Sequence, residues 1–263
     1  MKRKKYFFLK IVIAFFLLFV TFGAFLVFKS SFFNIKEIEV ASNLSCVSGM
    51  QIRNSAQILG KNIFFTDSKN LEKNVKNKFV CVKSVTLIKL FPSKVKIELS
   101  GRVPVAILAS LKNPEASVSA SIENIATPSA QNLSDSYLID EEAVFFAKSS
   151  GELNIPSIFT YDMDLSLGKK FDESYIKISL KILDKIKSFG LSVRLAAILD
   201  KFLVVYPDGL GPKIIFRLDE KGDAQIASLQ LILKTARIDS KELEFIDLRF
   251  DKPIVRFTPK KNG

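Results

Sequence analysis

The sequence contains no histidine and only two cysteines in 263 residues. The absence of histidine removes the commonest metal ligand in proteins and the usual general base of a nucleophilic triad. The spacings CxxC, HExxH and GxSxG are also absent. Residues 207–213 (PDGLGPK) lack the GxxxxGK[ST] spacing of a phosphate loop, and Pro212 has no amide hydrogen to donate. These absences predict a binding protein without catalytic, cofactor or metal sites.

The tightest cluster of acidic residues is Asp140, Glu141 and Glu142. Paired carboxylates can act as acid and base in a hydrolase of the cell wall. Adjacent carboxylates in a turn, however, point in different directions and are well solvated, so they lack the separation of pKa values that such catalysis requires. We therefore expect a solvated turn at these positions and no enzymatic activity.

The longest apolar run, residues 11–28 (IVIAFFLLFVTFGAFLVF), contains no charged residue. As a helix it would extend over roughly 27 Å, close to the thickness of the hydrocarbon core of a bilayer. This run predicts a transmembrane helix. A cleaved signal peptide is the alternative, but its apolar region usually covers only about 7–15 residues and ends in small residues. Cleavage after Ser30 or Ser31 would instead place Phe28 or Lys29 three residues before the cut.

Basic residues precede this run, and such flanks remain in the cytoplasm. They are Lys2, Arg3, Lys4, Lys5 and Lys10. We expect residues 1–10 to form a cytoplasmic basic tail and the chain from Lys29 onward to lie outside the plasma (inner) membrane. The formal charge of +12 partly reflects this flank. It does not indicate binding of nucleic acid, because no basic stripe with interleaved aromatic residues occurs. A solvated surface beside anionic lipid or wall polymer is the simpler interpretation.

The two cysteines, Cys46 and Cys81, fall outside the predicted membrane span. A disulfide bond is chemically allowed there, but the sequence does not place the two side chains within bonding distance. Two small buried apolar residues are the alternative, and we prefer it at this point.

Residues 35–100 show the order strand, helix, helix, strand, strand. The length of this segment suits one small domain. A strand is expected over 35–40. Ser48 and Gln51 have the spacing of a capping box, and the helix that follows is expected to continue through Leu59 to Gly60. Asp67 or Ser68 begins a second helix. Strands are expected over 80–89 and 94–100, joined by a turn at residues 91–93.

This order is accompanied by the stretches FFNIKEIEV, GKNIFFTD, VKSVTLIKLFPSKVKIEL and GRVPVAIL. Together they resemble a POTRA domain of the kind found in the FtsQ/DivIB family of bacterial cell-division proteins. The resemblance implies an α+β protein with a single N-terminal transmembrane helix and a β-α-α-β-β POTRA domain over residues 32–102. In the family this domain contacts other division or wall-synthesis proteins, but no residue here identifies a partner.

A segment rich in Ser, Ala, Asn and Pro follows, over residues 110–136. It has no sustained periodicity, and so long a connection without secondary structure is unusual inside a compact domain. We expect a flexible surface loop. Because relatives have a shorter link, the segment is either a tolerated insertion, which we favour, or a partner site.

The remaining sequence predicts a second domain over residues 103–258, with a tail at 259–263. YLIDEEAVFFAK reads as a hairpin, residues 172–189 as a helix capped by Asp172, and 223–236 as a further helix. Strands are expected over 192–199, 202–206 and 213–218, and two more within 243–257. The order and the closing ELEFIDLRFDKPIVRF resemble the FtsQ-type β domain, a mixed or antiparallel sheet with flanking helices. Ala143 departs from the family, where a turn glycine is common.

The resemblance also implies a function. FtsQ/DivIB proteins are scaffolds of the divisome at the division septum, and their last strands receive the division protein FtsB and, through it, FtsL. Aromatic residues in and just after the DLR-type strand contribute to this contact, and they correspond here to Phe250 and Phe257. We expect a partner segment to add as a strand at the terminal edge.

Three polar residues complete the expected partner site. In a regular strand Asp247 and Arg249 would lie on the face opposite Phe250, where they pair with neighbouring strands or meet the partner. Lys252 either contributes to the contact or, with Pro253, blocks promiscuous strand pairing. Two other functions stay open. An outer-membrane or secretion assembly factor would usually carry several POTRA repeats, and a membrane-anchored wall enzyme would need acidic residues that converge only in the fold.

Overall fold

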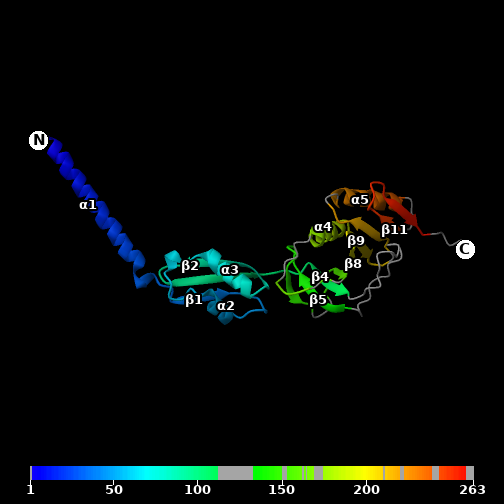
Figure 1. The fold of residues 1–263 in the computed structure, drawn as a ribbon, viewed down its shortest axis with the longest axis horizontal. Coiled ribbons are helices and arrows are strands. Elements are labelled where there is room, and N and C mark those ends of the chain that lie inside the picture. Colours follow the sequence, from blue (N-terminus) through cyan, green and yellow to red (C-terminus); the bar gives the residue numbers. More distant parts are fainter. Residues whose placement is uncertain are drawn as a thin grey trace. The chain divides into compact units, whose positions relative to one another are not determined.

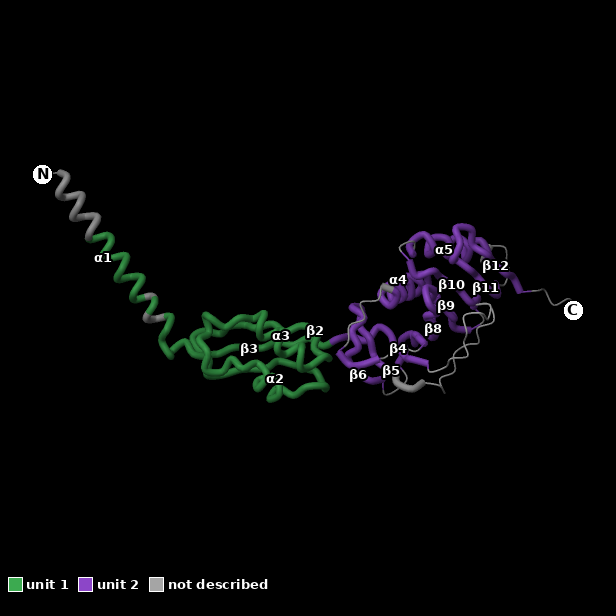
Figure 2. The backbone as a smooth tube through the Cα atoms, viewed as in Figure 1, with its two compact units in different colours: residues 1–101 green, residues 102–263 purple. Residues whose placement is uncertain are grey.

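The computed structural model describes residues 2–111, 133–149, 153–161, 163, 165–168, 174–209, 211–219, 222–238 and 243–258. The chain forms two compact units, residues 1–101 and residues 102–263 (Figure 2). The predicted domains cover residues 32–102 and 103–258, so their common boundary lies one residue after the boundary between the two units. Asp172 and the tail at 259–263 lie outside the described residues.

Unit 1 begins with the helix α1 (Lys2–Lys29), which contains the apolar run predicted to be helical. The described phenylalanines of this helix, among them Phe15 and Phe19, are exposed. A search of the described residues finds no helix with the length and hydropathy needed to cross a membrane. The helix itself is therefore observed, whereas its expected role as a transmembrane span over 11–28 has no support from this search.

The rest of unit 1 is a three-stranded sheet with two helices (Figure 1). Its elements are η1 (Ser31–Phe33), β1 (Glu37–Ala41), α2 (Gly49–Ala56), η2 (Ile63–Phe65), α3 (Ser68–Lys78), β2 (Val82–Leu90) and β3 (Lys94–Gly101). The sheet order is β1-β3-β2, with β1 parallel and β2 antiparallel to the central β3. This arrangement confirms the predicted β-α-α-β-β order.

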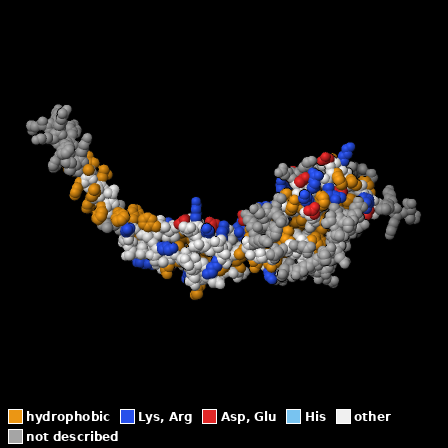
Figure 3. Space-filling view, in the orientation of Figure 1, with side chains coloured by type: hydrophobic (Ala, Val, Ile, Leu, Met, Phe, Trp, Pro, Cys, Tyr) orange, Lys and Arg blue, Asp and Glu red, His pale blue; other side chains and the backbone are white. Residues whose placement is uncertain are grey.

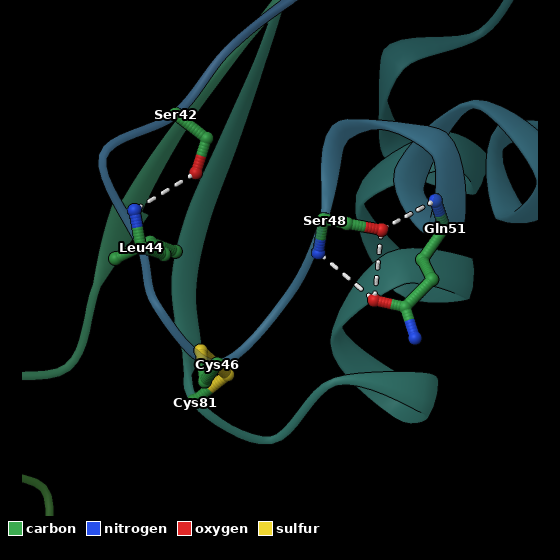
Figure 4. The surroundings of a disulfide bond; sticks show 6 residues. All are labelled: Ser42, Leu44, Cys46, Ser48, Gln51 and Cys81. Atoms are coloured by element: carbon green, nitrogen blue, oxygen red, sulfur yellow. Dashed lines mark hydrogen bonds between the residues drawn. A yellow bond between two sulfur atoms is a disulfide. The ribbon is translucent and has the colours of Figure 1, made fainter.

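Local signals in the sequence explain where the helices begin. Ser48 and Gln51 form the predicted capping box: the Ser48 amide donates to Gln51 Oε1 at 2.8 Å, and the Gln51 amide donates to Ser48 Oγ at 3.3 Å (Figure 4). Asp67 caps α3 by accepting from the amide of Lys69. The expected end of the first helix is wrong. Gln57 adopts a left-handed conformation, with φ 49°, so α2 ends at Ala56 and Leu59 is exposed.

Cys46 and Cys81 are joined by a disulfide bond (Figure 4). It links the loop before α2 to the residue that precedes β2, across 35 positions of the chain. The preferred interpretation from the sequence, two separate buried apolar residues, is therefore wrong, because the fold brings together two side chains that the sequence could not place. Disulfides persist in oxidising compartments and are rare in the cytosol of most organisms.

Unit 2 is built on one nine-stranded sheet. Its elements are β4 (Ala106–Leu111), β5 (Leu133–Ile139), β6 (Phe145–Lys148), β7 (Ser157–Tyr161), α4 (Ser174–Ser188), β8 (Val193–Leu199), β9 (Phe202–Pro207), β10 (Lys213–Arg217), α5 (Gly222–Ile238), β11 (Leu243–Asp247) and β12 (Ile254–Phe257). The strand order is β12-β11-β10-β9-β8-β7-β4-β5-β6. Three neighbouring pairs are parallel and the others are antiparallel, so the predicted mixed sheet is confirmed.

The main core of unit 2 lies between this sheet and the helices α4 and α5, which contact each other (Figure 1). Ile176, Leu183 and Ile186 supply the buried face of α4, as their helical spacing predicts. Strands also occupy both ends of the segment expected to be a loop, because β4 continues to Leu111 and β5 begins at Leu133. The expectation of a flexible loop otherwise falls on residues outside the described part of the chain.

Candidate functional site

The strand β12 lies at one end of the sheet order and has β11 as its neighbour. The two strands pair antiparallel, with Asp247 opposite Ile254 and Ile246 opposite Val255. Three large apolar side chains are exposed in this hairpin: Phe250 at 54%, Ile254 at 53% and Phe257 at 44%. We call these three residues the terminal patch; Ile254 and Phe257, three positions apart in β12, lie on opposite faces of the strand. An edge strand can accept a further strand through its backbone groups, and the hairpin combines a position at the end of the described sheet with exposed apolar side chains.

Asp247, at the end of β11, has a structural role within the hairpin. Its carboxylate is buried, with 2% exposure. Oδ1 accepts from the amide of Arg249 at 3.0 Å and from Arg249 Nε at 2.9 Å, and Oδ2 accepts from Arg249 Nη2 at 2.6 Å. Such a bidentate, charge-assisted pair fixes the guanidinium in place. The pairing expected from the sequence was with neighbouring strands, whereas the observed pair joins two residues that are two positions apart in the same segment. A contact of these residues with a partner stays a prediction.

The Arg249 guanidinium lies between two aromatic rings. Its Cζ is 5.0 Å from the centroid of the Phe202 ring and 5.4 Å from that of Phe250. Phe202 begins β9 and packs against the cluster of Val204, Ile215 and Phe245. The stack Phe202–Arg249–Phe250 therefore connects an exposed ring to the sheet through cation–π contacts.

The position of Phe250 differs from the expectation for a regular strand. Ile246 and Leu248 are buried in the main core, and Asp247 lies on the other face. Phe250 does not share the core face, because β11 ends at Asp247 and the ring turns toward Arg249. Lys252 is exposed in the same connection between β11 and β12.

No pattern in the sequence indicates two of the residues at this site. Phe202 is far from Arg249 along the chain, and Ile254 resembles any other apolar strand residue. Cross-strand neighbours share a face of the sheet, so Ile254 lies on the face of Asp247. Arg256, opposite Phe245 on that face, places its guanidinium 5.6 Å from the Phe245 ring.

Tyr206 on β9 packs against the same cluster as Phe202. Burial raises the pKa of its hydroxyl to about 12, and the negative charge that Tyr161 can carry adds to the effect. Within the described part of the chain this hydroxyl has no hydrogen-bond partner. Tyr206 is therefore neutral at physiological pH and adds no charge to this face of the sheet.

The acidic turn at 140–142 is only partly as expected. Glu141 and Glu142 are exposed, but Asp140 is buried, so the prediction of a solvated turn is wrong for this residue. Asp140 Oδ1 accepts from the amides of Glu142 and Val144, both at 3.0 Å, and Oδ2 accepts from Arg102. All of these contacts hold the turn together. Among the described residues no group of acidic or cysteine side chains could hold a metal ion.

Ala143, in the same turn, adopts a left-handed conformation with φ 61°. Residues other than glycine pay a steric cost there. The conformation explains why a glycine is common at this position in proteins that the sequence resembles.

A comparison with protein-family models gives a match over residues 33–102, to the model described as POTRA domain, FtsQ-type. The chain carries an FtsQ-type POTRA domain. The match supports its recognition as an FtsQ/DivIB protein and thereby associates it with cell division, in a family of non-enzymatic scaffolds. It ends at residue 102 and does not extend to the sheet of unit 2. No curated protein matches the chain.

Proposed function

We propose that this FtsQ-type protein is a single-span membrane scaffold of the bacterial divisome. In this proposal it links division proteins and regulates septal peptidoglycan synthesis through protein contacts, and a partner segment adds as a strand beside β12. The position of β12 at the end of the sheet order, together with the exposed terminal patch, carries the proposal.

Two kinds of contact would contribute to binding. The backbone of an added strand supplies hydrogen bonds, while pockets and rings at alternate side-chain positions select the partner. Phe250 would act as the apolar anchor. Arg249 contacts its ring, and Asp247 acts indirectly by holding Arg249. Lys252 would contribute from the connection between the strands, and Phe257 would add apolar contact at the other end of β12. Phenylalanine offers apolar contact without the hydroxyl of a tyrosine, so the anchor works by burial alone.

The proposed partners are the FtsB and FtsL type of division proteins, which the family resemblance implies. Other division or wall-synthesis proteins are proposed to contact the POTRA domain. The protein would localise to the plasma (inner) membrane at the division septum, and a fluorescent fusion checks this directly: a midcell ring is expected, whereas an even outline of the cell contradicts the proposal.

The membrane anchor would be α1. Its sequence from 11 to 28 has no charged residue, its described apolar side chains are exposed, and basic residues precede the run. A helix with apolar residues on all sides is stable when apolar surroundings cover it. The disulfide in unit 1 is consistent with an extracytoplasmic location for the rest of the chain.

The test of the partner edge is the substitution Phe250→Glu in the full chain, purified in detergent with its FtsB/FtsL-type proteins. A buried, unpaired carboxylate is costly, so loss of co-purification is expected. Leu167→Glu is the matched control, because Leu167 is also exposed and lies beside β6 at the opposite end of the sheet order. Unchanged capture by Phe250→Glu would remove the proposed edge.

A further inference from the structure

Exposed apolar side chains are unevenly distributed over the POTRA part of unit 1. Six large apolar residues between positions 30 and 101 are exposed: Phe32, Met50, Leu59, Phe65, Leu90 and Phe91. All except Met50 belong to segments that meet at the end of the domain next to α1. Scattered single apolar residues need no explanation, but a gathered set marks an interaction surface.

Backbone hydrogen bonds show how these segments meet. The Ile35 amide donates to the carbonyl of Lys61 at 2.9 Å, and the Gly60 amide donates to the carbonyl of Ile35 at 2.9 Å. The Lys36 amide donates to the carbonyl of Ser93 at 2.8 Å. The ends of η1 and α2 and the turn between β2 and β3 are therefore neighbours. We call the exposed residues Phe32, Leu59, Phe65, Leu90 and Phe91 the proximal patch.

Met50 lies away from the proximal patch. Gly49, its neighbour in α2, adjoins the side chain of Val40, which is opposite Ile97 in the sheet. Ile97 is three residues along β3 (Lys94–Gly101) from Lys94, roughly 10 Å at the usual rise per strand residue. The domain thus carries an equally exposed apolar residue away from the proximal patch, at 74% for Met50 against 73% for Phe65.

Aromatic contacts attach α1 to the proximal patch. The Phe64 ring lies 4.6 Å from that of Phe28 in the last turn of α1, 5.0 Å from that of Phe33, and 5.0 Å from that of Phe91. Asn62 Nδ2 also donates to the carbonyl of Phe28 at 2.5 Å. Figure 3 shows hydrophobic side chains along the described part of α1 up to this junction. The patch is thus continuous with the apolar surface of the helix.

Basic residues surround the patch. Lys29, Lys36 and Lys61 are exposed, and Lys29 Nζ lies 5.0 Å from the Phe25 ring. Lys89 Nζ donates to the carbonyl of Phe64 at 3.3 Å. The acidic Glu37 is paired with Lys94 at 2.9 Å. Segments that lie at a membrane–water interface combine phenylalanine and leucine side chains, which face the acyl chains, with lysines whose ammonium groups reach the headgroups.

We propose that the proximal patch is a lipid-contact surface that rests in the headgroup region of a bilayer containing anionic phospholipids. The proposal depends on the insertion of α1 stated under the proposed function. Once α1 is inserted, the contacts of Phe28 with Phe64 and Asn62 hold the patch where the helix leaves the membrane. Each lysine near an anionic surface strengthens the association about fivefold.

The full chain in vesicles provides the test, with an environment-sensitive fluorophore on a single introduced cysteine. Both native cysteines are in the disulfide, so Phe65→Cys or Met50→Cys supplies the one reactive thiol. In phosphatidylcholine vesicles containing phosphatidylglycerol and a lipid-bound quencher, the probe at 65 should shift to shorter wavelength and be quenched. The probe at 50 should keep the emission of a probe in water.

A charge variant tests the lysines separately. Combining Lys36→Glu and Lys61→Glu with Phe65→Cys should weaken quenching at 65 strongly, because two attractive charges become repulsive. Equal quenching in vesicles with and without phosphatidylglycerol would contradict the requirement for anionic lipid. If the probe became buried only after another membrane protein was added, the patch would be a binding site for that protein, and the lipid-contact proposal would be wrong.

Flotation of the vesicles separates failure of the anchor from failure of the patch. Protein that does not float overturns the proposed insertion of α1 and the lipid-contact surface with it. Protein that floats while the probe at 65 reports water overturns the lipid-contact surface alone. Protein that floats with a quenched probe at 65 and an unquenched probe at 50 supports both.

Discussion

The two edges of the nine-stranded sheet end in hairpins that are held by the same device. The β5–β6 hairpin has Asp140 after its inner strand, and the β11–β12 hairpin has Asp247 at the end of its inner strand. Both carboxylates are buried, accept from the amide two residues further on, and bind an arginine. The pair of a buried aspartate with an arginine is therefore structural in both hairpins. Its presence does not show which edge of the sheet binds a partner.

The hairpins differ in what surrounds the arginine. Arg102 Nη1 contacts a second carboxylate, that of Glu142, and β6 begins with the buried Phe145. Arg249 instead lies between two rings, one of them exposed, and most of β12 is exposed. Both hairpins lie at an edge of the sheet, but the β11–β12 hairpin also exposes large apolar side chains. Substitutions in the two hairpins should therefore have different effects.

The largest effect is expected from Asp140→Ala. The substitution leaves the Arg102 side chain, which is 11% exposed, without its buried partner and removes the acceptor of two backbone amides. Breaking a buried ion pair typically costs about 3–5 kcal/mol. Urea denaturation of the full chain should show this loss in the free energy of unfolding of unit 2. A decrease in the free energy of unfolding of less than about 0.5 kcal/mol, the usual effect of a surface substitution, would mean that other contacts hold the turn.

Asp247→Ala should destabilise unit 2 less, by about 2–3 kcal/mol, near the lower limit for such a pair. Arg249 is more exposed than Arg102, at 20% of its side chain, and it keeps its contact with the Phe202 ring. The same denaturation experiment measures the difference. Partner capture should fall as well, because Phe250 loses its fixed support, and a variant that keeps full capture would contradict this link.

Phe250→Ala should act on binding and leave folding almost unchanged. An exposed side chain contributes little to stability, within about 0.5 kcal/mol, whereas an aromatic anchor at an interface is commonly worth about 2 kcal/mol, or roughly 30-fold in Kd. Titration of the full chain with FtsB/FtsL-type proteins measures the change. Leu167→Ala at the opposite edge is the control, and equal losses in both variants would remove the distinction between the edges.

The smallest effect is expected from Ala143→Gly in the β5–β6 turn. Glycine adopts a positive φ without steric cost, so the free energy of unfolding should rise by about 0.5–1 kcal/mol. Thermal unfolding of unit 2 checks the sign. Ala196→Gly, at a buried strand position, should have the opposite effect, and a loss of stability in both variants would show that the Ala143 methyl matters more than its backbone conformation.

Sequence patterns predicted the features that depend on neighbours along the chain. The capping box of Ser48 and Gln51, a cap at Asp67 or Ser68 and the order of helices and strands along the POTRA domain follow from short-range spacing. The end of α2 was not predictable, because Gln57 is an unusual residue for a left-handed conformation. The preferred interpretation of the two cysteines was wrong, because only the fold decides which distant residues meet.

The candidate site shows the same division. The family resemblance predicts a partner site at residues 247–257, and alternation along a regular strand predicts that Asp247 lies on the face opposite Phe250. The contacts of Arg249 with Phe202 and of Arg102 with Asp140 join residues far apart in the sequence. No local pattern contains such a contact, so the contact of Arg249 with the Phe202 ring and the buried ion pair of Asp140 with Arg102 became apparent only from the fold.

The stack Phe202–Arg249–Phe250 has an entropic consequence. A side chain that becomes immobilised on association loses rotamer freedom, at a cost of about 0.5–1.5 kcal/mol. The Phe250 ring already rests on a guanidinium that is fixed by the Asp247 carboxylate on one side and by the Phe202 ring on another. An incoming polypeptide therefore has to order mainly itself, and this preorganisation favours recognition by a short segment that is flexible before it binds.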